Sequence, residues 1–258
     1  MPDSSHQRTH HGAVSFTLRL IFVFSIMGPL SVLYVLLCVV LLPARNLRIR
    51  AGNLYGKIVG PLVFKAAGIE PIIENKERVT ESAPALFVCN HTSTIDMWVG
   101  MWLCPFGGCG VAKKEITRVP FFGQAYQLSG HLLIDRGNRD RALNSMASAR
   151  EVVKKNNMSL WMWPEGTRSR DGKLLPLKKG FVHLAIATGL PIVPIVFHDA
   201  DQLWPGRTFR ATPGKLQIKV LEPVDTSEWK TETAAEHAEA IWQAFQNELS
   251  DRQKADTT

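Results

Sequence analysis

The first long feature of the chain is an apolar run without a charged residue, from Leu20 to Leu42. A helix rises 1.5 Å per residue, so these roughly 23 residues span about 35 Å, enough to cross a bilayer core. A second apolar segment, Leu54–Ile69, carries two lysines and suits a helix at the membrane surface better than a second span. The pattern predicts a membrane-associated helical segment over residues 13–70, preceded by a disordered tail over residues 1–12.

Three other interpretations of the N-terminal region stay open. One is a kinked hairpin that enters and leaves the same leaflet instead of crossing the membrane. A secretory signal is disfavoured, because the run is too long and no small-residue cleavage motif follows it. A buried helix of a soluble domain would be equally apolar. Arg45, Arg48 and Arg50 follow the run directly, and the positive-inside rule then places the rest of the chain on the cytoplasmic side. We therefore expect the protein at the cytoplasmic face of the inner (plasma) membrane.

From Pro84 onward, short apolar runs alternate with helical stretches, which predicts an α/β domain over residues 71–258. The predicted fold class is α/β, with a mostly parallel sheet flanked by helices and an N-terminal membrane-associated helical segment. The expected strands are Ala85–Cys89, His131–Ile134, Leu160–Trp163, Ile192–Phe197 and Leu216–Leu221. The expected helices are Thr94–Leu103, Arg139–Asn156, Lys179–Thr188 and Ala234–Leu249.

The composition narrows the possible partners. A formal net charge of +7 over 258 residues favours an anionic partner, such as an acidic membrane face or a phosphate-bearing substrate. Nucleic acid is not expected, because no recognition motif accompanies the charge. Four cysteines in so long a chain do not predict a disulfide framework, and their spacing does not predict a zinc site.

The first candidate for chemistry is the segment Asn90–Asp96, which follows an expected strand and precedes an expected helix. If His91 lies in the loop and Asp96 in the first helical turn, the carboxylate can orient the imidazole as a general base. The same residues also fit a purely structural interpretation. Ser93 and Asp96 have the spacing of a capping box, so Asp96 could serve only to cap the helix. Spacing alone does not decide between the two.

Four sequence blocks follow one another along the chain. The first is the Asn-His-x-Ser-x-x-Asp pattern of Asn90–Asp96, and the others are Lys113–Arg136, Trp163–Ser169 and Leu190–Val196. Together they resemble the glycerolipid and lysophospholipid acyltransferase family. In the second block Leu133 stands where Phe is frequent, and in the third Trp163 stands where Phe is commoner. One block would be weak evidence, but four in the same order are specific.

The resemblance implies an O-acyltransferase without a metal or other cofactor, in which His91 is the general base and Asp96 orients it. The acyl donor would be acyl-CoA or an acyl carrier protein. The acceptor would be a lysophospholipid, with 1-acyl-sn-glycerol 3-phosphate the most economical choice, giving phosphatidic acid for phospholipid biosynthesis. Membrane lipid would surround the site. The residues that the resemblance assigns to substrate binding are Lys113, Arg136, Glu165, Gly166, Thr167 and Arg168.

Other functions fit parts of the same pattern. A different lysolipid, such as a lyso-ornithine lipid, would need the same His91 and Asp96. A membrane-associated thioesterase or hydrolase would use the pair to activate water, and a lipid-binding scaffold would explain only the apolar run and the charge. Cys89 is better explained as a small buried strand residue than as a nucleophile. Basic residues on Arg139–Asn156 are typical of a solvated helix face, or of a surface that docks an acidic carrier protein.

Overall fold

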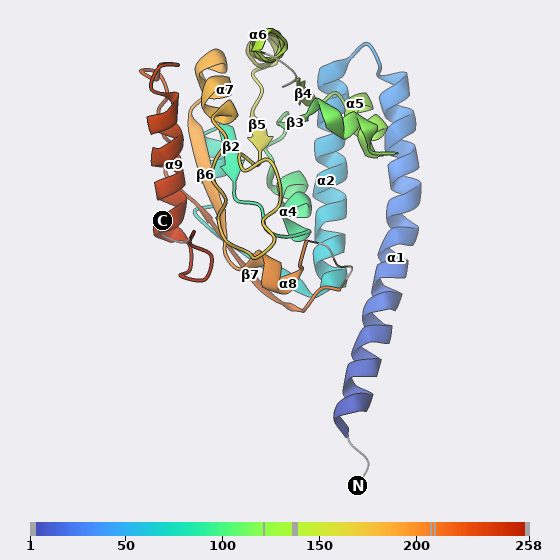
Figure 1. Ribbon diagram of the computed structural model, residues 1–258. Helices are drawn as coiled ribbons and strands as arrows, with labels where there is room; N and C mark the ends of the chain where they lie inside the picture. Colours follow the sequence, from blue (N-terminus) through green and yellow to red (C-terminus); the bar gives the residue numbers. More distant parts are fainter. Residues whose placement is uncertain (1–3, 121, 136–138, 207, 209, 256–258) are drawn as a thin grey trace.

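The computed structural model describes residues 4–120, 122–135, 139–206, 208 and 210–255 (Figure 1). The strands are β1 (Ile69–Glu74), β2 (Leu86–Cys89), β3 (Cys109–Lys113), β4 (Leu132–Ile134), β5 (Leu160–Met162), β6 (Ile192–Phe197) and β7 (Gly214–Val220). The helices are α1 (Ser4–Val40), α2 (Arg45–Ala67), α3 (Arg78–Glu81), α4 (Ile95–Leu103), α5 (Phe122–Leu128), α6 (Arg139–Asn156), α7 (Gly180–Thr188), α8 (Ala200–Leu203) and α9 (Ala234–Glu248), with a 3₁₀ turn at Lys114–Arg118.

The described strands form one sheet in the order β1-β7-β6-β2-β5-β3-β4. Every neighbouring pair is parallel except β6 and β7, which run antiparallel. Parallel strands are covered on both faces and therefore read as continuous apolar runs, and every residue of β2 and β6 is buried. The prediction of an α/β fold with a mostly parallel sheet is confirmed.

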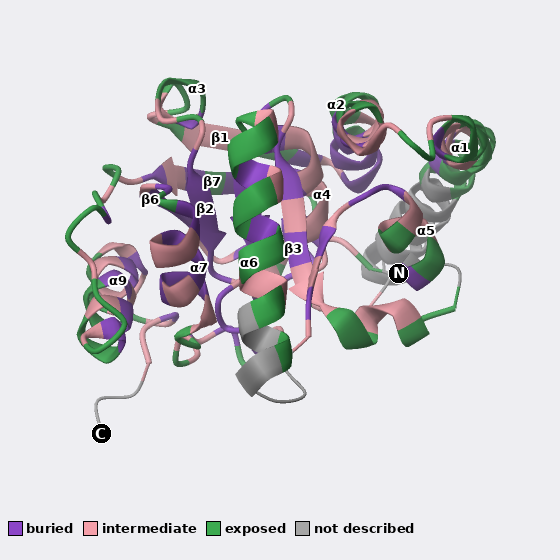
Figure 2. Ribbon diagram, turned by 90° about the horizontal axis from the view of Figure 1, so that it is seen from above, coloured by how far each residue is buried: buried purple, intermediate pink, exposed green. Residues whose placement is uncertain are grey.

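Two hydrophobic cores lie on opposite faces of this sheet (Figure 2). Successive residues of a strand point to opposite faces, so Phe87 joins one core and Val88 the other. The first core is closed by α2 and α4, and the second by α6, α7 and α9. The sheet is thus held rigidly between two helical layers, which fixes the positions at which its strands end.

The N-terminal helices occupy the edge of the molecule beside α4 and α5 (Figures 1 and 2). Within α1, Ile21–Val40 is long and apolar enough to cross a membrane, and most of it is not buried in the protein. Helix α2 is different, because one face packs against α4. An added Cβ at Gly56 would lie 2.3 Å from the Met101 carbonyl oxygen, so glycine is required for this close approach.

The structure corrects two of the predicted boundaries. Helix α1 already begins at Ser4, inside the segment predicted as a disordered tail, because the polar residues that precede the apolar run continue its helix. The predicted boundary at residue 70 falls inside β1, which pairs with β7, and α2 contributes Val59 and Val63 to the first hydrophobic core of the sheet. Packing of α2 on α4 therefore makes it part of the α/β domain as well as of the N-terminal segment.

The C-terminal segment after α9 is also fixed in place. Gln253 is fully buried and its Nε2 donates to the Phe197 carbonyl at the end of β6, at 3.1 Å. Its own carbonyl accepts from the Leu174 N–H at 2.8 Å. Arg252 adds paired bonds to Asp199 and Asp201. The chain end thereby fastens the loop that follows β5 to the end of β6.

Candidate active site

The carboxyl ends of neighbouring parallel strands bring separate sequence blocks together. β5 lies between β2 and β3, and all three run parallel. The residues that follow β2 are Asn90 and His91, those that follow β5 begin with Trp163, and β3 ends at Lys113. Ligands of open α/β sheets bind at this edge, so the topology itself places the blocks at a site.

His91 and Asp96 are in direct contact. The Asp96 Oδ2 lies 2.9 Å from the His91 Nδ1, and it also accepts the backbone N–H groups of Thr92 and Ser93, each at 2.8 Å. The Asp96 carboxylate is fully buried, whereas the His91 side chain keeps 13% of its exposure. A carboxylate on Nδ1 fixes the tautomer that has its proton there, which leaves the lone pair of Nε2 for a substrate.

The capping and catalytic interpretations of Asp96 are therefore compatible. Its bond to the Ser93 N–H is the reciprocal half of a capping box, and the Ser93 Oγ accepts from Ile95 at the start of α4. The Asp96 Oδ2 that accepts from the Ser93 N–H also holds the His91 imidazole. Asn90 stabilises the loop from the other side, because its side-chain amide exchanges two hydrogen bonds with the backbone of Phe197, at 2.8 and 2.9 Å.

Glu165 joins the third block to the first. Its Oε1 accepts from the His91 N–H at 2.6 Å and its Oε2 from the Leu175 N–H at 3.0 Å, while the Ser169 N–H donates to the His91 carbonyl at 2.8 Å. Only 1% of Glu165 is exposed. This burial raises the pKa of its carboxyl from 4.5 to about 8, although the two N–H donors act in the opposite direction. Glu165 thus holds the loop after β2 and the loop after β5 together from a buried position.

Gly166 makes room for two cationic side chains. Its backbone has a φ of +73°, and an added Cβ would lie 3.2 Å from the Lys178 Nζ and 3.4 Å from the Lys113 Cε. Lys113 was among the predicted binding residues, but Lys178 was missed. The signal for Lys178 is weak in the sequence, since it lies in a Lys-Lys pair nine residues beyond the third block. The two ammonium groups make this corner of the site suited to an anion.

The remaining predicted binding residues differ in their surroundings. The Arg168 Nη1 donates to the Gly206 carbonyl at 2.6 Å and contacts the Thr94 Oγ1 at 3.3 Å, so Arg168 lies beside the start of α4. Thr167 is exposed. Arg136 lies outside the described residues. The structure thus brings His91, Asp96, Glu165 and Arg168 together around one loop, with Lys113 and Gly166 at its side.

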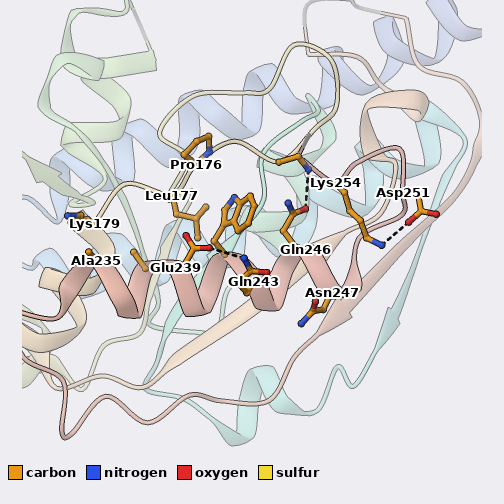
Figure 3. A pocket seen from close by; sticks show the side chains of 13 residues that line it. Pro176, Leu177, Lys179, Ala235, Glu239, Gln243, Gln246, Asn247, Asp251 and Lys254 are labelled. Carbon is orange, nitrogen blue, oxygen red and sulfur yellow. Dashed lines mark hydrogen bonds and ion pairs between the residues drawn. The ribbon is translucent and has the colours of Figure 1, made fainter. Parts of the chain in front are cut away.

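Other candidates for a catalytic group or a binding site have less support. Cys89 is fully buried, and burial raises its thiol pKa well above the ordinary value, so a thiolate nucleophile is disfavoured. Among the described residues, no cluster of His, Cys, Asp and Glu could hold a metal ion. A cavity of about 1090 Å³ lies along α9, but its lining includes none of the four blocks (Figure 3). Its polar side chains pair locally, as Lys254 does with Asp251.

Comparison with known proteins agrees with this arrangement. The sequence model of the Acyltransferase family matches residues 70–198. A 1-acyl-sn-glycerol-3-phosphate acyltransferase of Limnanthes douglasii is 43% identical over 231 residues, which cover 90% of this chain and 82% of that protein. An enzyme of the same name from Escherichia coli K12 is 38% identical over 154 residues, which cover 60% of this chain and 62% of that protein.

A solved structure supports the fold. The crystal structure of a 1-acyl-sn-glycerophosphate acyltransferase from Thermotoga maritima superposes with a TM-score of 0.65 at 24% identity, covering 91% of this chain and 93% of that one. Fold and site together define an α/β enzyme whose His–Asp pair lies at the carboxyl ends of parallel strands. The chain belongs to the Acyltransferase family.

Proposed function

We propose that the protein transfers a fatty acyl group from a thioester to the free hydroxyl of 1-acyl-sn-glycerol 3-phosphate, giving phosphatidic acid. The observation that carries the proposal is the contact between His91 and Asp96 beside the cationic corner at Gly166. The names of the related enzymes support the same acceptor. No metal or other cofactor is part of the proposed reaction.

The geometry suits direct transfer. The His91 Nε2 takes the proton of the substrate hydroxyl while that oxygen attacks the thioester carbonyl carbon. The tetrahedral intermediate collapses, the carbon–sulfur bond breaks, and the imidazolium returns the proton to the departing thiolate. Asp96 stabilises the imidazolium and keeps Nε2 directed outward. An ester and a free thiol are formed, and the enzyme carries no acyl group at any stage.

The phosphate of the acceptor would bind at the second and third blocks. Lys113 and Lys178 supply point charges over Gly166, whose left-handed backbone permits a close approach. Arg168 contributes a planar guanidinium beside the start of α4, where phosphate geometry can be matched. Arg136 would also bind the acceptor phosphate, a role that rests on its sequence block alone. Thr167 would add a hydroxyl that can hydrogen-bond to the phosphate.

Membrane attachment through α1 would keep this site near its lipid substrates. The helix offers an exposed apolar surface over Ile21–Val40, and Arg45, Arg48 and Arg50 follow it. We place the catalytic layer on the cytoplasmic face, where acyl-CoA and acyl carrier protein are both present. Arg141, Arg150, Lys154 and Lys155 are exposed on α6 and would face an acidic carrier protein if that is the donor.

The direct test uses membranes that contain the wild type or His91→Ala. Each is given labelled acyl-CoA, or labelled acyl carrier protein, with 1-acyl-sn-glycerol 3-phosphate, a lyso-ornithine lipid or no acceptor. We expect labelled phosphatidic acid from the wild type and almost none from the variant. Labelled ornithine lipid alone would replace the proposed acceptor, and free fatty acid without any acceptor would indicate a hydrolase. Equal product from both proteins would remove His91 as the base.

Lys178 offers a sharper test of the phosphate site, because its neighbour Lys179 is a matched control. Both are exposed, but only Lys178 reaches over Gly166. Lys178→Ala is expected to raise KM for the phosphate-headed acceptor about tenfold and to change kcat little, since it removes charge from binding and not from the reacting atoms. Lys179→Ala is expected to leave both constants unchanged. Equal effects of the two variants would exclude a specific role for Lys178.

A further inference from the structure

The imidazole of His91 is held by two groups, and only one of them is a carboxylate. Its ring stacks on the indole of Trp163, with centroids 4.9 Å apart and an angle of 27° between the planes. The bond from Nδ1 to Asp96 holds one edge of the imidazole, and small changes in the side-chain torsions can still tilt the ring. A flat surface against the ring face limits this tilt, so the direction of Nε2 depends on the indole as well as on Asp96.

The indole of Trp163 carries a polar group that this position does not satisfy. The Trp163 Nε1 is buried and has no hydrogen-bond partner among the described residues, and the same holds for Trp161. A buried N–H without a partner destabilises the folded state, whereas a phenyl ring at this position would have no such group. The N–H is therefore not what the site needs from Trp163, and the aromatic face against His91 is the part that a phenyl ring would share with it.

Helix α4 is shaped to admit this ring. Gly100 lies one helical turn beyond Asp96, on the same face of α4. An added Cβ at Gly100 would lie 3.1 Å from the Trp163 Cζ2 and 2.9 Å from the Trp161 Nε1. The same side of α4 thus carries two features of the site. Asp96 holds the edge of the His91 imidazole, and Gly100 leaves space for the Trp163 indole that covers the ring.

We propose that Trp163 is a positioning residue for the His91 base, whose indole fixes the imidazole plane and stabilises the imidazolium formed during acyl transfer. The electron-rich face of an indole attracts a cation stacked on it. The inference rests on the proposed function, because it concerns the same base. It assigns Trp163 a role in the chemical step and none in binding the acceptor.

The activity test compares three variants. Trp163→Leu removes the aromatic face and is expected to lower kcat about tenfold or more with little change in KM, because a misaligned base affects only the chemical step. Trp163→Phe keeps a face and is expected to stay within about threefold of the wild type. Gly100→Ala keeps the indole but displaces it, and is expected to resemble Trp163→Leu. Wild-type kcat in Trp163→Leu, or equal losses in Trp163→Leu and Trp163→Phe, would overturn the proposal.

A spectroscopic test does not depend on activity. An imidazolium quenches the fluorescence of an indole that it stacks on, so protonation of His91 by added acid should quench Trp163. Trp229 stacks on His237 in the same way, at 4.2 Å, so the relevant signal is the part that His91→Gln removes. That part should also be absent in Trp163→Phe. Quenching without phosphatidic acid synthesis would leave the stack intact and reject the proposed function, and absence of the signal would reject the stack.

Discussion

Replacing Asp96 with asparagine is expected to lower kcat for acyl transfer about 10³-fold or more while the protein stays folded. The amide oxygen of asparagine can still accept the N–H groups of Thr92 and Ser93, which keeps the loop in place. The negative charge beside the His91 Nδ1 is lost, so the imidazolium is no longer stabilised. Initial rates with the lysolipid acceptor, together with thermal unfolding, measure the two effects separately.

Ser93→Ala is the matched control for this variant. It removes the hydroxyl that accepts from Ile95 and donates to the Trp204 carbonyl, and leaves the His91–Asp96 contact untouched. A lost cap costs about 0.5–2 kcal/mol of stability, so this variant should unfold at a lower temperature with kcat close to the wild type. If Asp96→Asn behaves like Ser93→Ala, Asp96 is a helix cap and the proposed base has no orienting carboxylate.

The fold class could be predicted because it depends on patterns that tertiary contacts reinforce. Strands β2 and β6 are buried on both faces, so they appear in the sequence as unbroken apolar runs. β1 was missed because it carries Glu70, Pro71 and Glu74 among its apolar residues. A proline is tolerated there since β1 is at the edge of the sheet and pairs only with β7. β3 was missed because Gly110 and small residues give it no periodicity.

The sequence could propose residues for the candidate site but not their geometry. Spacing left the contact between His91 and Asp96 undecided, because it depends on where the helix begins. The structure starts α4 at Ile95, which places His91 in the loop and Asp96 in the first turn. Lys178 lies beside Gly166, whose left-handed conformation no pattern of residue types specifies. For Trp163 the sequence shows only that Trp stands where Phe is commoner, and it does not predict the contact with His91.

Several residues make more than one kind of contact, which explains why single interpretations of the sequence were incomplete. Asp96 caps α4 and also contacts the His91 imidazole, and Arg45, expected as a topology signal, donates from Nε to the Gly130 carbonyl at 2.7 Å. That bond ties α2 to the turn before β4, a strand that lies within the second block. Helix α2 is therefore connected to the edge of the sheet that carries this block.

Glu165→Gln is expected to change the pH dependence of stability. In the unfolded chain the Glu165 carboxyl has its ordinary pKa of 4.5, and burial raises the pKa to about 8 in the folded protein. Between these values the folded state holds a proton that the unfolded state has released. The contribution of the protonated carboxyl is therefore complete below about pH 4.5 and is lost as the pH rises through about 8, a change on the order of a few kcal/mol.

Glutamine does not titrate, so the variant isolates this contribution. Its amide nitrogen would face one of the two backbone N–H donors, from His91 or Leu175, which makes the variant less stable than the wild type at pH 5. Urea unfolding from pH 5 to 9 should show this difference shrinking with rising pH and levelling off above about 8. A difference that stays constant across the range would mean that Glu165 is already ionised at pH 5, so that its two N–H donors outweigh its burial.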